Sequence, residues 1–171
     1  SLESLDKIVR LKEELENVRL YMEIQKERFG EKIQWEISMA EECENVKIPA
    51  MILQPLCENS IVHGMAPMLR PVTLLISAHM EEKKLCLSVI DNGAGISHQE
   101  MDRLKSEMQE WREYDDAGGI GIGNTFQRLQ MFYHGMAEFQ MESIPKERTV
   151  IAFLLPISEE MSVKREPEEL R

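Results

Sequence analysis

The chain has 171 residues, of which 43% are hydrophobic and 6% aromatic, and its formal net charge at pH 7 is −11. This composition is typical of a globular domain, and no apolar run approaches the roughly 20 residues that a membrane-spanning helix needs. The negative charge argues against nucleic acid as a partner, and Cys43, Cys57 and Cys86 lack metal-ligand spacing, which favours reduced thiols.

The first predicted element is an amphipathic helix over residues 2–28. Apolar residues recur at every third or fourth position, as on one face of a helix: Leu5, Ile8, Leu11, Leu15, Val18, Met22 and Phe29. The solvated side is expected to carry Glu13, Glu14, Glu16, Lys26 and Glu27. Gly30 is placed to end the helix. The apolar seam is consistent with packing on the helix's own domain or with the end of a dimerisation helix.

A strand and a second helix follow. Apolar and polar residues alternate over residues 32–39, which predicts a half-buried strand, and residues 41–45 form a loop. A helix is expected from Pro49 to about His63, with an irregularity at Pro55 and an end at Gly64. Asn59 and His63 share one face of this helix, with Glu58 beside them, and such oxygens can hold a hard cation.

Two strands, over residues 73–80 and 85–90, are predicted to pair through a turn at residues 81–84. Alternation in the second places Leu85, Leu87 and Val89 on one face, so Asp91 points the same way. A carboxylate aimed at a core costs several kcal/mol unless it is compensated. Asp91 and the glycines behind it therefore predict a pocket that accepts hydrogen bonds from a polar ligand.

The remaining chain contains a second glycine-rich loop. A polar helix is expected over residues 98–111 with Ser97 as its N-cap, followed by a mobile segment at 113–119. The run from Gly119 to Asn124 then opens a helix, whose free N–H groups suit phosphate oxygens. Strands are predicted over residues 137–142 and 149–155. The whole is an α/β two-layer sandwich, with helices on one face of a mixed, mostly antiparallel sheet and an additional N-terminal helix.

Three motifs in this order resemble those of the ATP-binding catalytic domain of the histidine kinase and GHKL (Bergerat-fold) ATPase superfamily. Gln54-Pro55-Leu56-Cys57-Glu58-Asn59-Ser60-Ile61-Val62-His63-Gly64 is similar to its N box. The two glycine boxes are matched by Asp91-x-Gly93-x-Gly95-Ile96 and Gly119-x-Gly121-Ile122-x-Asn124. The sequence Gln-Pro-Leu-x-Glu-Asn and the pair Arg128-Leu129 are most similar to those of sensor kinases of the LytS/YesM type. The resemblance covers residues 10–156.

The resemblance implies a role for each motif residue. Asp91 would accept the adenine amino proton, and Asn59 would ligate Mg²⁺, with Glu58 as its catalytic neighbour and His63 nearby. Other residues are implied to surround the nucleotide: Gly93, Gly95, Ile96 and Thr149 near the base, and Gly119, Gly121, Ile122, Gly123 and Asn124 along the triphosphate. Residues 1–30 would then end a dimerisation helix, residues 31–157 form the ATP-binding domain, and residues 158–171 form a disordered tail.

The implied function is that of the catalytic domain of a two-component sensor histidine kinase. It would use Mg-ATP to phosphorylate a His on an upstream dimerisation domain, for relay to a response regulator. Pro55 stands where hydrolytic superfamily members carry a general-base Glu, which favours phosphoryl transfer over hydrolysis. The full-length protein would be a homodimer, and this chain a soluble, cytoplasmic part of a membrane-anchored sensor. None of the four histidines has the Pro-His-Phe context of an acceptor.

Two departures keep alternatives open. Val62 stands where these kinases often have a Lys, and Arg148 replaces a usual Gly. One alternative is an anti-sigma-factor Ser/Thr kinase of the same fold. The other is a degenerate module that has lost nucleotide binding and serves dimerisation.

Overall fold

A five-stranded mixed sheet forms the centre of the computed structural model, which describes residues 7–65, 69–109 and 121–157. The strand order is β2-β4-β5-β7-β6, and only β2 and β4 run parallel. The strand bounds are Ile33–Met39 for β2, Val72–Glu81 for β4, Lys84–Asp91 for β5, Glu138–Ile144 for β6 and Arg148–Pro156 for β7. All five were predicted, and the expected fold class is confirmed.

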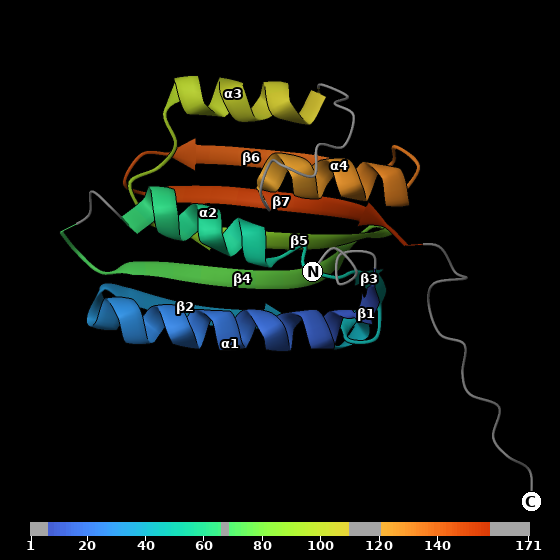
Figure 1. Ribbon diagram of the computed structural model, residues 1–171, viewed down its shortest axis with the longest axis horizontal. Coiled ribbons are helices and arrows are strands. Elements are labelled where there is room, and N and C mark those ends of the chain that lie inside the picture. Colours follow the sequence, from blue (N-terminus) through green and yellow to red (C-terminus); the bar gives the residue numbers. More distant parts are fainter. Residues whose placement is uncertain (1–6, 66–68, 110–120, 158–171) are drawn as a thin grey trace, which may run out of the picture.

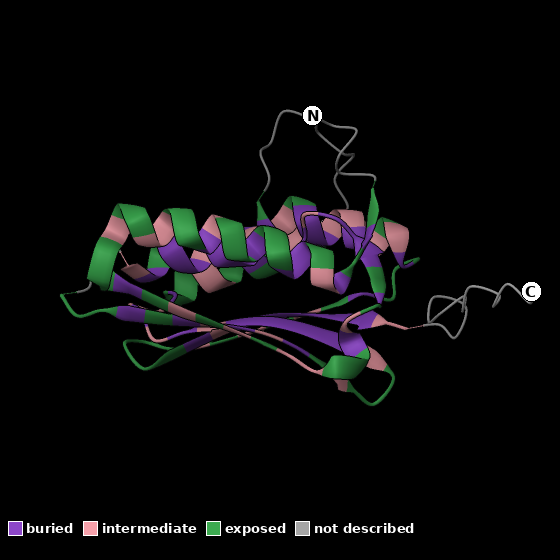
Figure 2. Ribbon diagram, turned by 90° about the horizontal axis from the view of Figure 1, so that it is seen from below, coloured by how far each residue is buried: buried purple, intermediate pink, exposed green. Residues whose placement is uncertain are grey.

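The helices lie on one face of this sheet and leave the other face without a helical layer (Figures 1 and 2). Their bounds are Leu11–Phe29 for α1, Gln54–Met65 for α2, His98–Gln109 for α3 and Ile122–Phe132 for α4. Short 3₁₀ turns follow at Gly30–Lys32 and Glu41–Cys43. Ser97 caps α3 as predicted, because its hydroxyl accepts a hydrogen bond from the Glu100 N–H at 3.2 Å.

A second, two-stranded sheet was not predicted from the sequence. Strand β1 (Ile8–Arg10) pairs antiparallel with β3 (Lys47–Pro49) at one end of the helical layer. Helix α1 therefore begins at Leu11, and the expectation of a helix from residue 2 is wrong over residues 8–10. Strands of three residues are too short for a period-two pattern to stand out from a helical one.

Helix α2 also begins later than predicted. Pro49 ends β3, and the helix starts at Gln54, so Pro55 lies in its first turn. A proline there causes no kink, because its missing N–H would have no partner within the helix. Gly64 lies inside the last turn of α2 and does not end it.

The core lies between the helices and the inner face of the sheet, where Figure 2 shows buried residues on both layers. From α1 it receives Leu11, Leu15, Val18 and Met22, each at most 4% exposed. The helix thus packs on its own domain, the first of the two interpretations of its seam, and Gly30 forms its C-cap at φ 58°. The domain boundary at residue 30 stays a prediction, but the core crosses it without a break.

The prediction of Glu14 on the solvated side of α1 is wrong. Its side chain is 1% exposed and lies in the interior. Position 14 is three residues after Leu11 and four before Val18, so it belongs to the apolar face after all. The apolar pattern was visible, but a charged residue within it was assigned to solvent.

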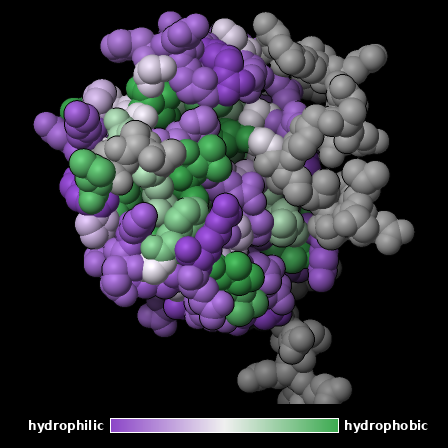
Figure 3. All heavy atoms as spheres, turned by 60° about the vertical axis from the view of Figure 1, so that its left-hand side comes forward, coloured by the Kyte–Doolittle hydropathy of each residue, from purple (hydrophilic) through white to green (hydrophobic). Residues whose placement is uncertain are grey.

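The outer surface is mixed. Some large apolar side chains remain exposed, among them Leu20 and Ile24, one turn apart on α1, and Val62 on α2. Figure 3 shows hydrophobic groups scattered between hydrophilic ones on one end of the molecule. Within the described residues, no helix is long and apolar enough to cross a bilayer.

Candidate functional site

The inward-facing carboxylate predicted from the β5 pattern is present. Asp91 ends β5, is 4% exposed, and lies opposite Leu74 on β4 and Thr149 on β7. Its Oδ1 accepts a hydrogen bond from the Gly93 N–H at 2.9 Å. Burial raises the pKa of Asp91, and the Gly93 N–H and the nearby Ser60 hydroxyl act in the opposite direction. A buried carboxylate with one protein donor retains the capacity to accept further hydrogen bonds.

Polar groups gather around this carboxylate. The Ser60 hydroxyl is buried and has no hydrogen-bond partner of good geometry among the described residues. The Thr149 side chain, 3% exposed, lies 3.1 Å from the Ser143 hydroxyl, which accepts the Ile96 N–H at 2.9 Å. The Ser60 and Thr149 hydroxyls therefore lie beside a buried carboxylate, an arrangement common where a ligand supplies further partners.

The crevice at Asp91 is narrow. It is lined by Asn59, Ser60, His63, Gly64, Asp91, Gly95, Ile96 and Thr149. Beside it, two glycines are in close contact: a Cβ on Gly93 would lie 2.5 Å from the Gly64 carbonyl oxygen. The Ala94 N–H also donates to that oxygen at 3.0 Å. Gly93 is therefore needed for close approach of the loop to α2.

Two open cavities continue from this crevice and share Asn59 and His63. One, of about 350 Å³, lies between α2, the loop after β5 and α3, and is lined by Asn59, His63, Ala94, Gly95, Ile96, Ser97, Glu100 and Leu104. The other, of about 390 Å³, reaches the start of α4 and is lined by Asn59, His63, Arg103, Leu104, Glu107, Gly121, Ile122, Gly123, Asn124 and Gln127. The amide of Asn59 and the imidazole of His63 thus border all three spaces.

The start of α4 is built as the second glycine motif predicted. Gly121 is the N-cap, and its carbonyl accepts hydrogen bonds from the Thr125 N–H and hydroxyl, both at 3.0 Å. The N–H groups of the first turn of an α-helix have no partner within the helix, and the helix dipole favours an anion there. Gly119, which was also expected to border the phosphates, lies outside the described residues.

Glu58 lies elsewhere. Its carboxylate accepts a hydrogen bond from the Gln54 amide at 2.9 Å, and it lines none of the three spaces. The pKa of Tyr21 on α1 is raised to about 12, mainly by burial and next by the negative charge of Glu58. The Glu58 carboxylate therefore lies on the side of α2 that faces α1. Its catalytic role stays a prediction, and a turn toward the cavity would require breaking its bond to Gln54.

Arg103 is a site residue that the sequence reading missed. Its guanidinium lines the larger cavity and forms ion pairs with Glu100 and, at 2.7 Å, with Glu107. Val62, by contrast, is 63% exposed and lines none of the cavities. The signal for Arg103 was its spacing of three and four from two glutamates on a helix between the glycine boxes, which predicts a fixed cation.

The segment before α2 is held from two sides. Both oxygens of Glu14 accept backbone N–H groups, from Met51 at 2.9 Å, Ile52 at 2.8 Å and Leu53 at 3.0 Å. The Arg128 guanidinium of α4 donates to the carbonyls of Ala50 at 2.6 Å and Met51 at 3.1 Å. Helices α1 and α4 thereby fix the start of α2, which carries Asn59.

Comparisons with known proteins agree with this geometry. Residues 45–159 match the family described as histidine kinase-, DNA gyrase B- and HSP90-like ATPase. The chain is 30% identical over 156 residues to the sensor histidine kinase YesM of Bacillus subtilis, covering 90% of this chain and 25% of that protein. It is 28% identical to the sensor protein kinase HptS of Staphylococcus aureus, covering 92% and 30%. The chain thus spans about a quarter to a third of these relatives.

Solved structures show the same fold. The catalytic domain of histidine kinase ThkA, in a nucleotide-free form, superposes with a TM-score of 0.64 at 15% identity, covering 91% of this chain and 97% of that one. The histidine kinase AdeS of Acinetobacter baumannii gives a TM-score of 0.62 at 15% identity, covering 90% and 68%.

Proposed function

We propose a function on the premise that this chain belongs to the histidine kinase-, DNA gyrase B- and HSP90-like ATPase family and binds ATP. The chain is the Mg-ATP-binding catalytic domain of a sensor histidine kinase. In the full-length protein it donates the γ-phosphoryl group to a His on the dimerisation helices, for relay to a response regulator. The same proposal holds that the full-length protein is a homodimer, with residues 1–30 as the end of its dimerisation helix. It also holds that a membrane anchor is part of the full-length protein.

The observation that carries the proposal is the buried Asp91 carboxylate. It lines the narrow crevice that shares Asn59 with the two open cavities. The adenine amino group is a donor that suits an ionised carboxylate with free acceptor positions. Ser60 and Thr149 lie at the same place and supply hydroxyls to the base. The phosphates extend to the start of α4, where Gly121, Ile122, Gly123 and Asn124 line the cavity.

The residues present also fit a hard cation. The Asn59 amide borders both open cavities, and the carboxylates of Glu100 and Glu107 reach one cavity each. Oxygen ligands of this kind hold Mg²⁺, which usually binds through few protein groups and the substrate phosphates. Asn59 would hold the Mg²⁺, which would neutralise charge on the phosphates. Arg103 supplies a guanidinium that lines the larger cavity, whereas the exposed Val62 lines neither open cavity.

Calorimetric titration with Mg-ADP and Mg-GDP tests adenine recognition. The chain should bind the adenine nucleotide, and Asp91→Asn should weaken ADP binding about 10- to 150-fold, because a hydrogen bond to a charged group is worth about 1.5–3 kcal/mol. Asp102→Asn, on the exposed side of α3, is the matched control and should leave the affinity unchanged. Repeating the titration without Mg²⁺, and with Asn59→Ala, tests the metal. If the unmodified chain binds neither ADP nor ATP, the degenerate dimerisation module replaces this proposal.

Phosphoryl transfer needs a separate experiment. With γ-labelled ATP, the full-length protein should form an acid-labile phosphohistidine, whereas this chain alone should stay unlabelled. The reason is that none of His63, His79, His98 and His134 has an acceptor context. Stable label on this chain, or transfer from it to a serine of a partner protein, would count against the histidine kinase assignment.

A further inference from the structure

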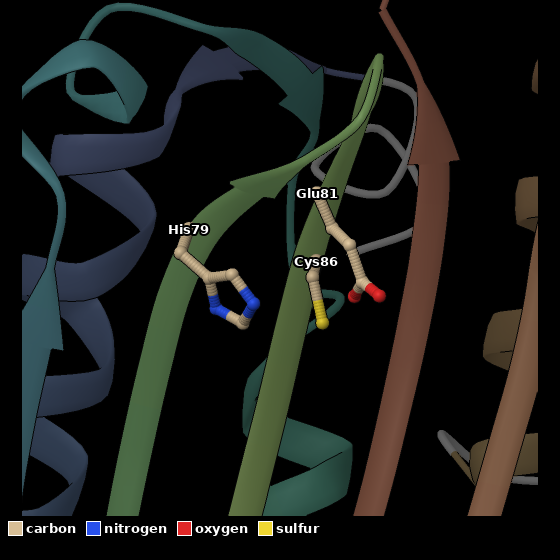
Figure 4. A group of neighbouring side chains, drawn as sticks. All are labelled: His79, Glu81 and Cys86. Carbon is tan, nitrogen blue, oxygen red and sulfur yellow. The ribbon is translucent and has the colours of Figure 1, made fainter.

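Three side chains of different chemistry meet on the outer face of the sheet, away from the helices. His79 on β4 lies directly opposite Cys86 on β5, and Glu81 follows two residues after His79 on the same face. One donor atom from each, a ring nitrogen, a carboxylate oxygen and the Sγ, lie within 4.8 Å of one another. Figure 4 shows the three side chains reaching into the same space on one side of β4 and β5.

The polar atoms of His79 and Glu81 have no other partner within the described residues. His79 and Glu81 are exposed, and no hydrogen bond or ion pair of either side chain is found there. Lys84, which lies opposite Glu81 in the register, instead forms an ion pair with Glu138. Cys86 differs from the two other cysteines, which lie in the main core, because it packs in a small outer cluster with Ala152 and Leu154.

We propose that His79, Glu81 and Cys86 form a binding site for a borderline divalent transition metal of the Zn²⁺ class. Imidazole nitrogen, thiolate sulfur and carboxylate oxygen are the ligand types that Zn²⁺ takes, whereas Mg²⁺ and Ca²⁺ take oxygen ligands. Three protein ligands leave a fourth position of a tetrahedral site for water. On binding, the Cys86 thiol releases its proton to solvent, and the thiolate forms the bond to the metal.

The required adjustment is small. Bond lengths of 2.0–2.3 Å place the ligand atoms of a tetrahedral zinc site roughly 3.3–3.8 Å apart. The largest separation here is 4.8 Å at most, so the donors must approach by about 1–1.5 Å at most. His79 and Glu81 are exposed and can rotate toward Cys86, which is held in the sheet between its neighbours. The cysteine lacks metal spacing in the sequence because the pairing of β4 with β5, and not chain proximity, assembles the site.

This site is separate from the nucleotide cavities. Those lie on the helical side of the sheet, and His79, Glu81 and Cys86 line none of them. The test of the metal site therefore has a readout that does not depend on ATP binding or kinase activity.

Co²⁺ titration of the reduced, metal-free chain tests the proposal. One equivalent should give the near-ultraviolet thiolate-to-Co²⁺ band and the intense visible bands of tetrahedral Co²⁺, and one equivalent of Zn²⁺ should remove both. Cys86→Ser should abolish the thiolate band. Loss of a residue that only hydrogen-bonds to a metal ligand already costs about 10–100-fold in metal affinity. Because His79 and Glu81 would bind the metal directly, His79→Ala and Glu81→Gln should each weaken binding at least that much. His134→Asn is the matched control, since it removes an exposed imidazole elsewhere.

Other outcomes overturn the proposal. These are the absence of a thiolate band, a band that survives Cys86→Ser, or one that is indifferent to both His79→Ala and Glu81→Gln. Thermal unfolding of each variant without metal should match the unmodified chain, which separates lost binding from lost folding.

Discussion

The strongest structural prediction concerns Glu14. Its carboxylate accepts three N–H groups at 2.8–3.0 Å, and two of these bonds are buried. Replacing Glu14 by Ala leaves the donors of Met51, Ile52 and Leu53 without partners just before α2. Hydrogen bonds to charged groups are worth about 1.5–3 kcal/mol each, but removal also ends the cost of burying the charge. We expect a net loss of about 3–5 kcal/mol in the free energy of unfolding.

Urea unfolding, followed by circular dichroism, measures this loss. With a slope of about 2 kcal/mol per molar urea, the midpoint should fall by about 1.5–2.5 M. Glu14→Gln should lie between Ala and the unmodified chain. Its amide oxygen keeps the acceptor for Ile52 and Leu53, whereas its amide nitrogen opposes the Met51 N–H. Glu16→Ala, an exposed acidic residue of the same helix, is the matched control and should change the stability by less than about 0.5 kcal/mol. If Glu14→Ala unfolds at the same urea concentration as Glu16→Ala, the clamp does not hold α2.

Two further predictions concern the cavity. Arg103→Ala should weaken ATP binding about 3- to 10-fold and leave adenosine binding unchanged. The expected loss is small because an exposed guanidinium already paired with Glu100 and Glu107 contributes less than a buried one. Calorimetry checks this, with Lys105→Ala as the control on α3, and an equal loss for adenosine would contradict a phosphate contact. Ligand-free Asp91→Asn should be more stable than the unmodified chain at neutral pH. Burial raises the folded-state pKa of Asp91 above its ordinary 3.8, so the cost to folding is present above the folded-state pKa and disappears as the pH falls below the ordinary value. The advantage of Asp91→Asn in denaturant unfolding should therefore shrink toward about pH 4, and a constant or growing advantage would refute the reasoning.

Local periodicity predicted most of the sheet and the inward turn of Asp91. The pairing of β5 continues without a bulge from Leu85 to Asp91, so the direction of the Asp91 side chain follows from that of its neighbours. The glycine motifs likewise predicted the loop after β5 and the start of α4, although the close neighbour of Gly93 is the backbone of Gly64. These features depend on residues close together in the chain.

Features that depend on distant residues were missed. Glu14 is buried because segment 51–53, 37 to 39 residues further on, offers three N–H groups, and nothing near position 14 signals this. The pairing of β1 with β3 and the meeting of His79 with Cys86 also depend on strand register. Arg103 reaches the cavity only because α3 packs against α4, which brings it to the space that α2 also lines. Tertiary packing decides such positions, and a single sequence does not encode it as a pattern.

The contact between Gly64 and the loop at Gly93–Ala94 couples two segments of the nucleotide site. The Gly64 carbonyl accepts the Ala94 N–H at 3.0 Å, and a Cβ on Gly93 would lie 2.5 Å from the same oxygen. The end of α2 and the loop that follows Asp91 are therefore joined through backbone atoms alone, and they take their positions as one unit. The geometry of the base and metal positions then depends on two adjoining glycines, so a side chain added at Gly93 would displace the loop after Asp91 and the end of α2 together.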